Sequence, residues 1–329
     1  MRFFVTGGAG FIGSHYVRAL LRSVYPGREG ADVTVLDRLT YAGNLANLAS
    51  AAGHPQFTFV RGDIADGSLL KEVLPGHDVI VNFAAESHVD RSIDDAGDFV
   101  VTNVLGTQRL LQAALEYGVR TFVQVSTDEV YGSIDDGAWP ETEPLLPNSP
   151  YSASKAGADL LCRAFHRTYG MDVRITRCSN NYGPWQYPEK IIPLFITSLF
   201  DGRKVPLYGD GQNVREWLHV EDHCRGIQLV LEKGSAGETY NIGGGTELTN
   251  LELVGGLLKA VGAGWDMVEY VADRPGHDRR YSIDTTKIRG LGYRPEVDFD
   301  DGLAAVVRWY ADNEDFWRPL IEAAYPAVR

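Results

Sequence analysis

The chain has 329 residues, of which 44% are hydrophobic, so it can form one large or two modest domains with cores of their own. Its formal net charge is −13, which argues against nucleic acid or an anionic membrane surface as the main partner. The three cysteines are too widely spaced for a disulfide framework or a zinc site, and no apolar run approaches the ~18 residues that a membrane span needs.

We therefore expect a globular cytoplasmic protein with no metal site. The chain enters a strand at its first residues, which leaves no room for a signal peptide. Cys162, Cys178 and Cys224 are typical of small core residues in a reducing compartment. In so acidic a chain, an anionic ligand would need a local cluster of basic residues.

The first forty residues predict a βαβ unit. Arg2 to Thr6 is a short apolar strand, the glycine-rich loop Gly7 to Gly13 opens a helix, and Asp32 to Asp37 is a second strand. Glycines in such a loop let backbone N–H groups at the helix start approach a pyrophosphate. The acid that ends the second strand, Asp37, suits a ribose 2′-hydroxyl and favours NAD over NADP, although Arg38 keeps NADP open.

Strands and helices continue to alternate along the chain. A long amphipathic helix is expected over Asp98 to Tyr117, and the further strands are Phe57 to Arg61, Asp78 to Ala84, Thr121 to Thr127 and Asp172 to Cys178. Six strands with right-handed crossovers predict a Rossmann-type α/β fold, with a doubly wound parallel sheet that binds ligands at the carboxyl ends of its strands. The polar candidates for a site stand at such ends.

Chemically active side chains follow the strand Thr121 to Thr127. Its terminal hydroxyl is succeeded by two carboxylates, Asp128 and Glu129, which a strand entering a core would not carry. Just downstream, a helix places Tyr151 and Lys155 four residues apart, on one face. A phenol beside an ammonium can act as a general base, because the cation lowers the phenol pKa from ~10. Taken alone, the Tyr/Lys pair also fits a solvated helix face, and the two acids also fit a polar loop.

The composition changes after Tyr182, where proline, glycine and aromatic residues become frequent. Glu216 to Leu231 is expected to be a helix that returns to the main sheet, and Glu238 to Ile242 a further strand. The predicted division is a NAD-binding Rossmann domain at 1–182 plus about 216–245, and a smaller, interleaved α/β substrate-binding domain at about 183–215 plus 246–329. Cations that suit a diphosphate, but also fit a solvated surface, are Lys190, Arg203, Lys204, Arg215, Arg274, Arg279 and Arg280.

These residues carry a family resemblance. The loop Gly7 to Gly13, the hydroxyl at Thr127 and the Tyr151/Lys155 pair resemble the extended short-chain dehydrogenase/reductase superfamily. Within it, three segments closely resemble the dTDP-glucose 4,6-dehydratase family: Ala84 to Ser92, Ser126 to Gly132 and Arg274 to Asp278. The resemblance runs over essentially the whole chain.

The adjacent Asp128-Glu129 pair is the most specific mark of this resemblance. Related sugar-nucleotide epimerases share the loop and the Tyr/Lys pair but have no acid–base pair after the hydroxyl residue. The link from Gly132 to Ser149 is shorter than in many relatives, which bears on how the mouth of the pocket closes and not on the catalytic residues.

The resemblance implies a mechanism with NAD⁺ as a tightly bound cofactor that is regenerated in each turnover. Tyr151, with its pKa lowered by Lys155 and by the charge of the nicotinamide, would take the proton of the glucose C4 hydroxyl, which Thr127 orients. Glu129 would remove the C5 hydrogen and later return a proton there. Asp128, kept protonated beside a second carboxylate, would protonate the departing C6 hydroxyl.

The resemblance also implies the binding residues and the assembly. The cofactor would be bound by Gly7, Gly10, Phe11, Ile12, Gly13, Asp37, Arg38, Leu39, Thr40, Asp63, Ile64, Phe83, Ala84, Ala85, Ser87, Thr102, Tyr151, Lys155 and Asn181. dTDP-glucose would be bound by Ser87, Thr127, Asn180, Lys190, Pro206, Leu207, Tyr208, Arg215, Asn250, Arg274 and His277. A homodimer would form through the helices at Asp98–Tyr117 and Tyr151–Tyr169.

Three functions stand side by side at this point. The leading one is dehydration of dTDP-glucose to dTDP-4-keto-6-deoxyglucose. The second is the same chemistry on another nucleotide sugar, or a C4 epimerisation in which Asp128 and Glu129 would be incidental. The third is a non-catalytic NAD-binding protein on the same fold, which would not need the acid, the base and the phenol together.

Overall fold

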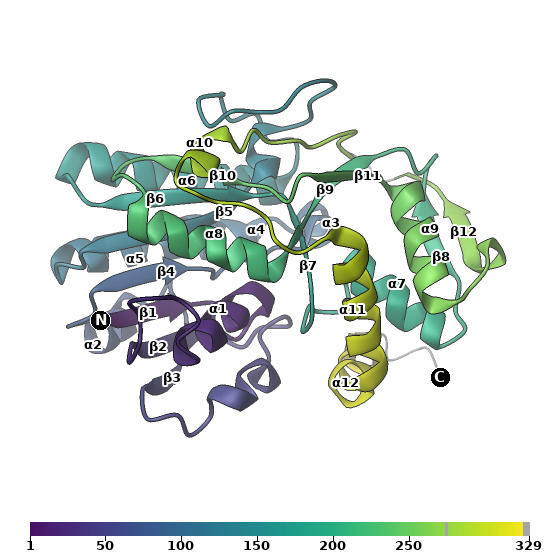
Figure 1. Cartoon of the computed structure of the whole chain (residues 1–329). Helices are drawn as coiled ribbons and strands as arrows, with labels where there is room; N and C mark the ends of the chain where they lie inside the picture. The colour runs from purple at the N-terminus through teal and green to yellow at the C-terminus, as the bar shows by residue number, and fades with distance from the viewer. Residues whose placement is uncertain (274–275, 325–329) are drawn as a thin grey trace.

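The computed structural model describes residues 1–273 and 276–324. Its main element is a parallel sheet of seven strands in the order β10-β6-β5-β4-β1-β2-β3 (Figure 1). The order reverses between β1 and β4, and a doubly wound sheet binds ligands beside such a reversal. The strands are β1 (Arg2–Thr6), β2 (Asp32–Asp37), β3 (Phe57–Arg61), β4 (Val79–Asn82), β5 (Thr121–Thr127), β6 (Val173–Cys178) and β10 (Thr239–Ile242). The predicted Rossmann-type fold is confirmed.

Helices cover both faces of this sheet, which explains why its strands read as continuous apolar runs. Phe3 and Val5 of β1 pack with α1 (Phe11–Leu21) and α8 (Val220–Lys233). Phe4, between them, points to the opposite face. The helices of that second face are α2 (Gly67–Val73), α5 (Thr107–Glu116) and α6 (Pro150–Tyr169).

A second core lies beside the sheet, on the right in Figure 1. Two small sheets belong to this region, ordered β11-β9-β7 and β12-β8. Their strands are β7 (Asn180–Tyr182), β8 (Val205–Tyr208), β9 (Val214–His219), β11 (Thr246–Thr249) and β12 (Val268–Val271). The helices that pack there are α7 (Ile191–Phe200), α9 (Asn250–Val261), α11 (Phe299–Asp312) and α12 (Glu314–Ala324).

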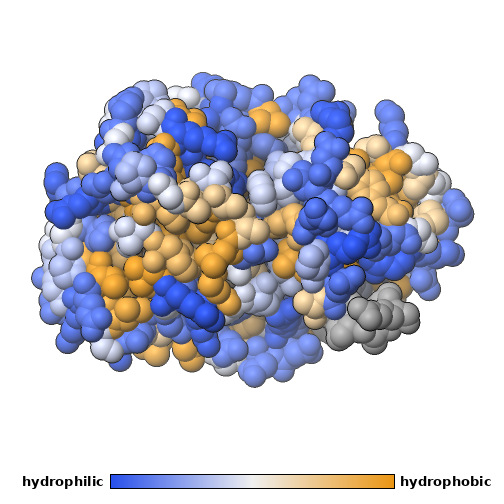
Figure 2. All heavy atoms as spheres, turned by 90° about the horizontal axis from the view of Figure 1, so that it is seen from below, coloured by the Kyte–Doolittle hydropathy of each residue, from blue (hydrophilic) through white to orange (hydrophobic). Residues whose placement is uncertain are grey.

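Seven shorter helical elements complete the described fold. They are η1 (Leu45–Ala51), α3 (Val89–Asp94), α4 (Gly97–Phe99), η2 (Val100–Gly106), η3 (Asp128–Tyr131), η4 (Trp265–Met267) and α10 (Thr286–Gly290). None of the described helices has the length and apolar character required to cross a membrane. Seen from below, hydrophilic side chains surround a broad hydrophobic area under the seven-stranded sheet (Figure 2).

The structure corrects the helix expected over Glu216 to Leu231. Residues 216–219 belong to the strand β9, and helix α8 begins at Val220. The strand was not recognised because it contains the charged Glu216. The side chain of Glu216 is buried, and its Oε1 accepts a hydrogen bond from the backbone N–H of Gly245 at 2.8 Å. An inward carboxylate breaks the apolar pattern by which strands are recognised.

The helix expected over Asp98 to Tyr117 is not uniform. Its middle part, η2, is a π-helix between α4 and α5. The buried Asn103 lies within it and donates to the backbone oxygen of Glu86 at 3.0 Å and to Ser154 Oγ at 2.8 Å. π segments of this kind are frequent at functional sites, and this one joins the end of β4 to α6.

Strand β4 is shorter than the predicted Asp78 to Ala84, because the chain leaves the sheet after Asn82. The predicted domain boundaries remain a prediction. Within the sheet β11-β9-β7, β7 comes from the first predicted domain, β11 from the second, and β9 crosses their boundary. Elements of both predicted domains therefore meet in one sheet.

Candidate active site

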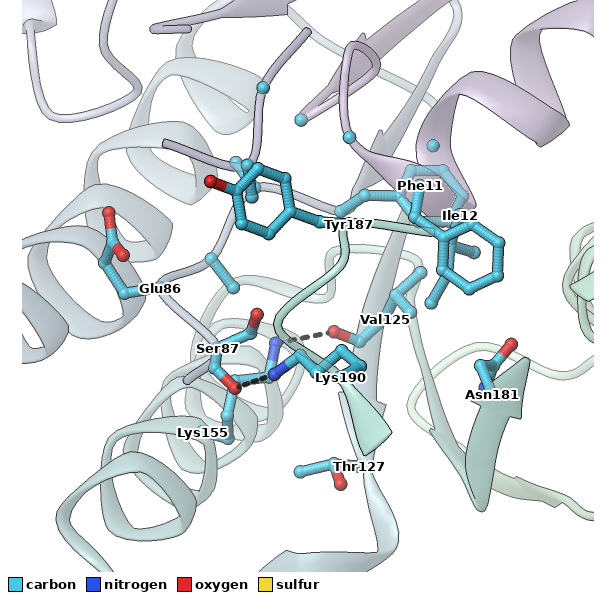
Figure 3. Close-up of a pocket in the computed structure, with 18 of the residues that line it drawn as sticks. Phe11, Ile12, Glu86, Ser87, Val125, Thr127, Lys155, Asn181, Tyr187 and Lys190 are labelled. Atoms are coloured by element: carbon cyan, nitrogen blue, oxygen red, sulfur yellow. Dashed lines mark hydrogen bonds between the residues drawn. The ribbon is translucent and has the colours of Figure 1, made fainter. Parts of the chain in front are cut away.

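A cavity of about 350 Å³ opens at the carboxyl ends of the central strands. Every residue predicted to bind the cofactor lines it, except Leu39. The predicted catalytic residues Thr127, Asp128, Glu129, Tyr151 and Lys155 line the same cavity. Figure 3 shows Phe11 and Ile12 on one side of it and Thr127 and Lys155 on the other. The structure therefore brings the two predicted sets together.

The glycine-rich loop is closed too tightly for side chains at two positions. Gly7 has φ +68°, and a Cβ there would lie 2.6 Å from the backbone nitrogen of Ala84. A Cβ on Gly13 would lie 2.4 Å from the carbonyl oxygen of Gly7. The loop therefore presents bare backbone at the start of α1, the arrangement that accepts a pyrophosphate.

Asp37 lies at the end of β2, where its carboxylate fixes the surrounding loops. Its two oxygens accept hydrogen bonds from the backbone N–H groups of Ala9 at 2.9 Å and Leu39 at 2.8 Å. Burial raises the pKa of Asp37, and these two hydrogen bonds act in the opposite direction. Leu39 thus contributes its backbone, in the left-handed region at φ +57°, and its side chain does not line the cavity.

Arg38 is exposed and forms an ion pair with Asp63, at 3.3 Å between Nη1 and Oδ2. Both residues line the cavity. Because this arginine already faces a carboxylate, and Asp37 lies beside it, the local charge favours a free ribose hydroxyl over a 2′-phosphate. The structure therefore supports the preference for NAD over NADP.

The acid pair occupies the short helix η3, directly after β5. Thr127 caps this helix, because its Oγ1 accepts a hydrogen bond from the N–H of Glu129 at 3.3 Å. The same hydroxyl donates to Asp128 Oδ1 at 3.1 Å. Burial raises the pKa of Asp128 well above its ordinary value, and Glu129 and Glu216 add to the effect. This shift favours the protonated form of Asp128, which is the form that its predicted role as an acid requires.

Tyr151 and Lys155 lie on the first turns of α6, whose start is capped by a reciprocal pair of hydrogen bonds between Ser149 and Ser152. Burial raises the pKa of Tyr151 well above its ordinary value, and the carboxylate of Glu129 acts in the same direction. The predicted lowering of this pKa by Lys155 together with the nicotinamide charge stays a prediction. The Lys155 ammonium donates to the carbonyl oxygen of Val125 at 2.7 Å (Figure 3).

Three of the residues predicted to bind the sugar and diphosphate line the cavity. They are Ser87, Asn180 and Lys190, and Lys190 Nζ donates to the backbone oxygen of Ser87 at 2.9 Å across the cavity (Figure 3). This hydrogen bond links the loop after β4 to the start of α7.

The other residues predicted to bind the nucleotide lie outside the cavity lining. Pro206, Leu207 and Tyr208, predicted for the base, belong to β8, and Asn250, predicted to close over the nucleotide, opens α9. Arg215, predicted for the diphosphate, lies on β9. Tyr208 is partly exposed, and its ring meets that of His277 edge-on, with 6.2 Å between ring centroids. Arg274 lies outside the described residues.

The predicted basic cluster is largely neutralised by carboxylates. Three of its arginines form ion pairs on the surface: Arg203 with Asp201, Arg279 with Asp210, and Arg280 with Glu247. Lys190 is the member that lines the cavity, and Arg215 lies behind the acid pair, where its charge opposes the raised pKa of Asp128.

Comparisons with known proteins agree with this geometry. Residues 4–306 match the family model described as GDP-mannose 4,6 dehydratase. The dTDP-glucose 4,6-dehydratase of Streptomyces niveus is 63% identical over 321 residues, 97% of this chain and 96% of that protein. This chain belongs to the dTDP-glucose 4,6-dehydratase family.

Solved structures support the same assignment. The structure of the dTDP-glucose 4,6-dehydratase DesIV from Streptomyces venezuelae, with NAD and TYD bound, is 65% identical with a TM-score of 0.96, covering 97% of this chain and 100% of that chain. The UDP-glucose 4-epimerase of Thermotoga maritima, solved with UDP-glucose, shares the fold at 32% identity and a TM-score of 0.88, over 95% and 100% of the two chains. The dehydratase likeness is thus the stronger of the two.

Sequence reasoning missed several residues of this dehydratase cavity. They are Leu36, Ala42, Gly43, Gly62, Glu86, Val125, Ser126, Cys178, Ser179, Gln186, Tyr187, Glu189, Ile191, Ile192 and Trp217. The segment from Gln186 to Ile192 enters after Trp185, which has φ +70°, a backbone conformation that bulky residues rarely adopt. The density of Pro, Gly and aromatic residues was its sole signal in the sequence.

The cavity fits a polar cofactor and substrate. Among the described residues, thirteen buried side-chain nitrogen or oxygen atoms have no hydrogen-bond partner, and seven of them belong to residues that line the cavity. The seven residues are Ser126, Asp128, Ser179, Asn180, Gln186, Glu189 and Trp217. Buried polar atoms are normally satisfied, so such a concentration indicates a surface that is completed by ligand groups. Together with the bare loop at Gly7 and Gly13, this fits NAD.

Proposed function

We propose that this chain catalyses the NAD-dependent dehydration of dTDP-glucose to dTDP-4-keto-6-deoxyglucose, a hydro-lyase reaction of deoxysugar biosynthesis. One observation carries the proposal. A buried acid, Asp128, and a more accessible carboxylate, Glu129, stand next to each other in the cavity that also holds the phenol of Tyr151. Dehydration needs all three groups, whereas a C4 epimerisation or simple NAD binding needs no acid–base pair.

The cofactor would be held by the glycine loop at Gly7–Gly13, by Asp37 and by the cavity wall formed by residues 83–85. NAD⁺ held there would supply the reversible hydride acceptor that oxidation at C4 and reduction at C6 require. The residues of the chain supply the proton transfers that accompany these two events.

Tyr151 takes the proton of the C4 hydroxyl, and Thr127 orients that hydroxyl. The raised pKa of Tyr151 keeps its phenol protonated in the resting chain. The positive charge of a bound nicotinamide acts in the opposite direction, so proton removal is coupled to cofactor binding. Lys155, fixed on Val125, supplies a second positive charge from the next turn of α6.

Glu129 and Asp128 divide the elimination step between them. Once C4 is a ketone, the C5 hydrogen is acidic, and Glu129 removes it as a proton. Asp128 gives its proton to the C6 hydroxyl, so that the C–O bond breaks and water leaves. Once C6 carries the returned hydride, Glu129 restores a proton to C5. Tyr151 then releases to solvent the proton that it took from the C4 hydroxyl, and Asp128 takes one up from solvent. The sum is the loss of one water with no net change in the cofactor.

The nucleotide half of the substrate is assigned to the region beside the cavity. Ser87, Asn180 and Lys190 would bind the sugar and the diphosphate, since they line the cavity. The base would stack on Tyr208 between Pro206, Leu207 and His277, and Arg215, Asn250 and Arg274 would complete the site. This assignment is supported by the closeness of the Tyr208 and His277 rings.

Mass spectrometry of the sugar nucleotide tests the proposed function. The purified chain is incubated with dTDP-glucose and no added NAD. We expect the product to have lost one water without net formation of NADH, because the cofactor is regenerated and stays bound. An unchanged mass with inverted C4 would replace the proposal by epimerisation. No conversion with or without added NAD⁺ would remove the enzymatic proposal for this substrate.

The assembly, compartment and domain boundaries are further parts of the proposal. A homodimer would bury the large apolar side chains that η2 and α6 expose side by side, namely Val100, Val101, Leu105, Leu160 and Tyr169. A cytoplasmic location is supported by the cysteines, all three of which are buried free thiols. The NAD-binding domain would comprise 1–182 plus about 216–245, and the nucleotide-sugar domain the remainder.

A further inference from the structure

A buried arginine lies behind the acid pair, outside the cavity lining. Arg177, on β6, is 5% exposed, and its Nε donates to Asp159 Oδ2 at 2.9 Å. Its Nη1 donates to the hydroxyl of Tyr131 at 2.8 Å, and its guanidinium carbon lies 4.7 Å from the centre of that ring. Asp159 and Tyr131 are each 1% exposed. The proposed proton transfers use none of these three residues.

The two partners of Arg177 belong to the two elements that carry the proposed catalytic residues. Tyr131 is the last residue of η3, the short helix that begins with Asp128 and Glu129. Asp159 lies on α6, one turn after Lys155 and two turns after Tyr151. Arg177 is therefore a bridge between the acid pair and the phenol–lysine pair.

The hydroxyl of Tyr131 extends this bridge. It donates to Asn241 Oδ1 on β10 at 2.9 Å, and Asn241 Nδ2 in turn donates to the backbone oxygen of Trp139 at 2.9 Å. Trp139 lies on the short link between η3 and α6. The ring of Tyr131 also packs with Ala156 of α6. The end of η3 is thus fixed from the sheet, from α6 and from the link.

Asp159 also acts on the lysine. Burial lowers the pKa of Lys155, and the carboxylate of Asp159 opposes this effect. Asp159 Oδ2 is held by Arg177, while Oδ1 is buried without a hydrogen-bond partner among the described residues. The orientation of this carboxylate therefore depends on the arginine.

We propose that Arg177 is a positioning residue which, through Tyr131 and Asp159, sets the placement of the acid pair on η3 relative to Tyr151 and Lys155 on α6. A buried ion pair is a poor source of stability, since apolar replacements of equal size are often neutral or stabilising. We infer that the ion pair serves to orient its partners, because a planar guanidinium can fix two of them at once. A misplacement of catalytic groups by about 1 Å can lower a rate by about a hundredfold.

The test is the variant Tyr131→Phe, which keeps the ring and removes the hydroxyl. The matched control is Tyr293→Phe, another buried tyrosine, whose hydroxyl donates to the backbone oxygen of Gly243 at 3.2 Å. For wild type and both variants, one measures kcat and KM for dTDP-glucose, the unfolding temperature, and the fraction of bound cofactor that is reduced during turnover, from its near-ultraviolet absorbance.

In Tyr131→Phe we expect kcat to fall about tenfold or more with KM within about twofold. Reduced cofactor should accumulate, because the phenol still removes the C4 proton while the misplaced acid pair slows the elimination. Tyr293→Phe should keep the wild-type kcat and cofactor spectrum. Arg177→Lys, if the variant folds, should also accumulate reduced cofactor, because a lysine cannot bind both Tyr131 and Asp159.

Three results would overturn the inference. One is an unchanged kcat in Tyr131→Phe. The second is a lower kcat with fully oxidised cofactor, and the third is a loss of kcat that follows the unfolding temperature in both tyrosine variants. Either of the last two would indicate a merely structural role. The inference rests on the proposed function, and the wild-type enzyme measured in parallel separates the two: if wild type does not dehydrate dTDP-glucose, the proposed function itself has failed.

Discussion

Two adjacent residues of similar chemistry occupy different environments in this chain. Asp128 is buried, 3% exposed, and accepts a hydrogen bond from Thr127, whereas Glu129 is only partly buried. A low dielectric disfavours a carboxylate, so burial raises the pKa of Asp128. This difference in burial fits the proposed roles of Asp128 as the acid and Glu129 as the base.

This burial predicts a pH-dependent effect of Asp128→Asn on stability. The folded-state pKa of Asp128 lies above the unfolded value of ~3.9, so the carboxyl destabilises the fold increasingly as the pH rises above that value. We expect Asn to raise the free energy of unfolding at pH ~7 by about 1 kcal/mol or more, and to have no effect below pH ~4. Denaturant unfolding at several pH values measures this.

The same variant should lose about 10²–10⁴-fold in kcat, since it has no proton to donate. Asp136→Asn, at an exposed position of the link after η3, is the matched control and should change neither quantity. A stability gain in Asp128→Asn that is independent of pH would contradict the assignment of Asp128 as the protonated member.

At the scale of elements, the sequence predicted the strands of the main sheet well and the smaller sheets poorly. The bounds of β1, β2, β3 and β5 agree with the predicted ones. β1 and β5 lie inside the sheet, and strands buried on both faces read as apolar runs. β9 was missed because its buried Glu216 interrupts that pattern. The π segment η2 has no sequence period of its own and could not be separated from the helices around it.

The candidate site was likewise predicted well in one part and poorly in another. Its cofactor side was predictable, since glycines and acids at strand ends have few other uses. Apart from Lys190, the segment from Gln186 to Ile192 was not, because it follows the unusual backbone at Trp185 and has no sequence pattern of its own. The burial that raises the pKa of Tyr151 also escaped prediction, and the neighbouring Glu129 acts in the same direction.

The glycine loop offers a test at this scale. In Gly13→Ala, the new Cβ would lie 2.4 Å from the Gly7 carbonyl oxygen, so the loop must open. We expect the affinity for NAD⁺ to fall at least about tenfold, or about 1.4 kcal/mol, by titration calorimetry, and less cofactor to copurify. Gly67→Ala on α2 is the control: its Cβ meets nothing within 4 Å, so the affinity should be unchanged. Equal affinities of the two variants would refute the role of the loop.

For the whole molecule, the proposed dimer explains why a chain of net charge −13 leaves large apolar side chains exposed on η2 and α6. Leu105 is 41% exposed and Leu160 is 55% exposed. We expect Leu105→Asp or Leu160→Asp to weaken self-association by about a hundredfold in sedimentation equilibrium, because a charge would be buried in the interface.

Leu146→Asp is the matched control for the dimer. Leu146 is 65% exposed but lies on the link between η3 and α6, away from both helices. It should leave the association unchanged. A wild-type chain that sediments as a monomer at all accessible concentrations would rule out the dimer.

The proposed roles of Glu129 as the base and Tyr151 as the group that removes the C4 proton are tested most directly by one spectroscopic experiment. Glu129→Gln and Tyr151→Phe are each mixed with dTDP-glucose, and the reduced nicotinamide and the mass of the sugar nucleotide are followed together. Glu129→Gln should still oxidise C4, accumulate reduced cofactor and release no water, while Tyr151→Phe should stay oxidised. Water loss by Glu129→Gln at a rate near that of wild type would contradict the assignment of Glu129 as the base, and with it the dehydration mechanism.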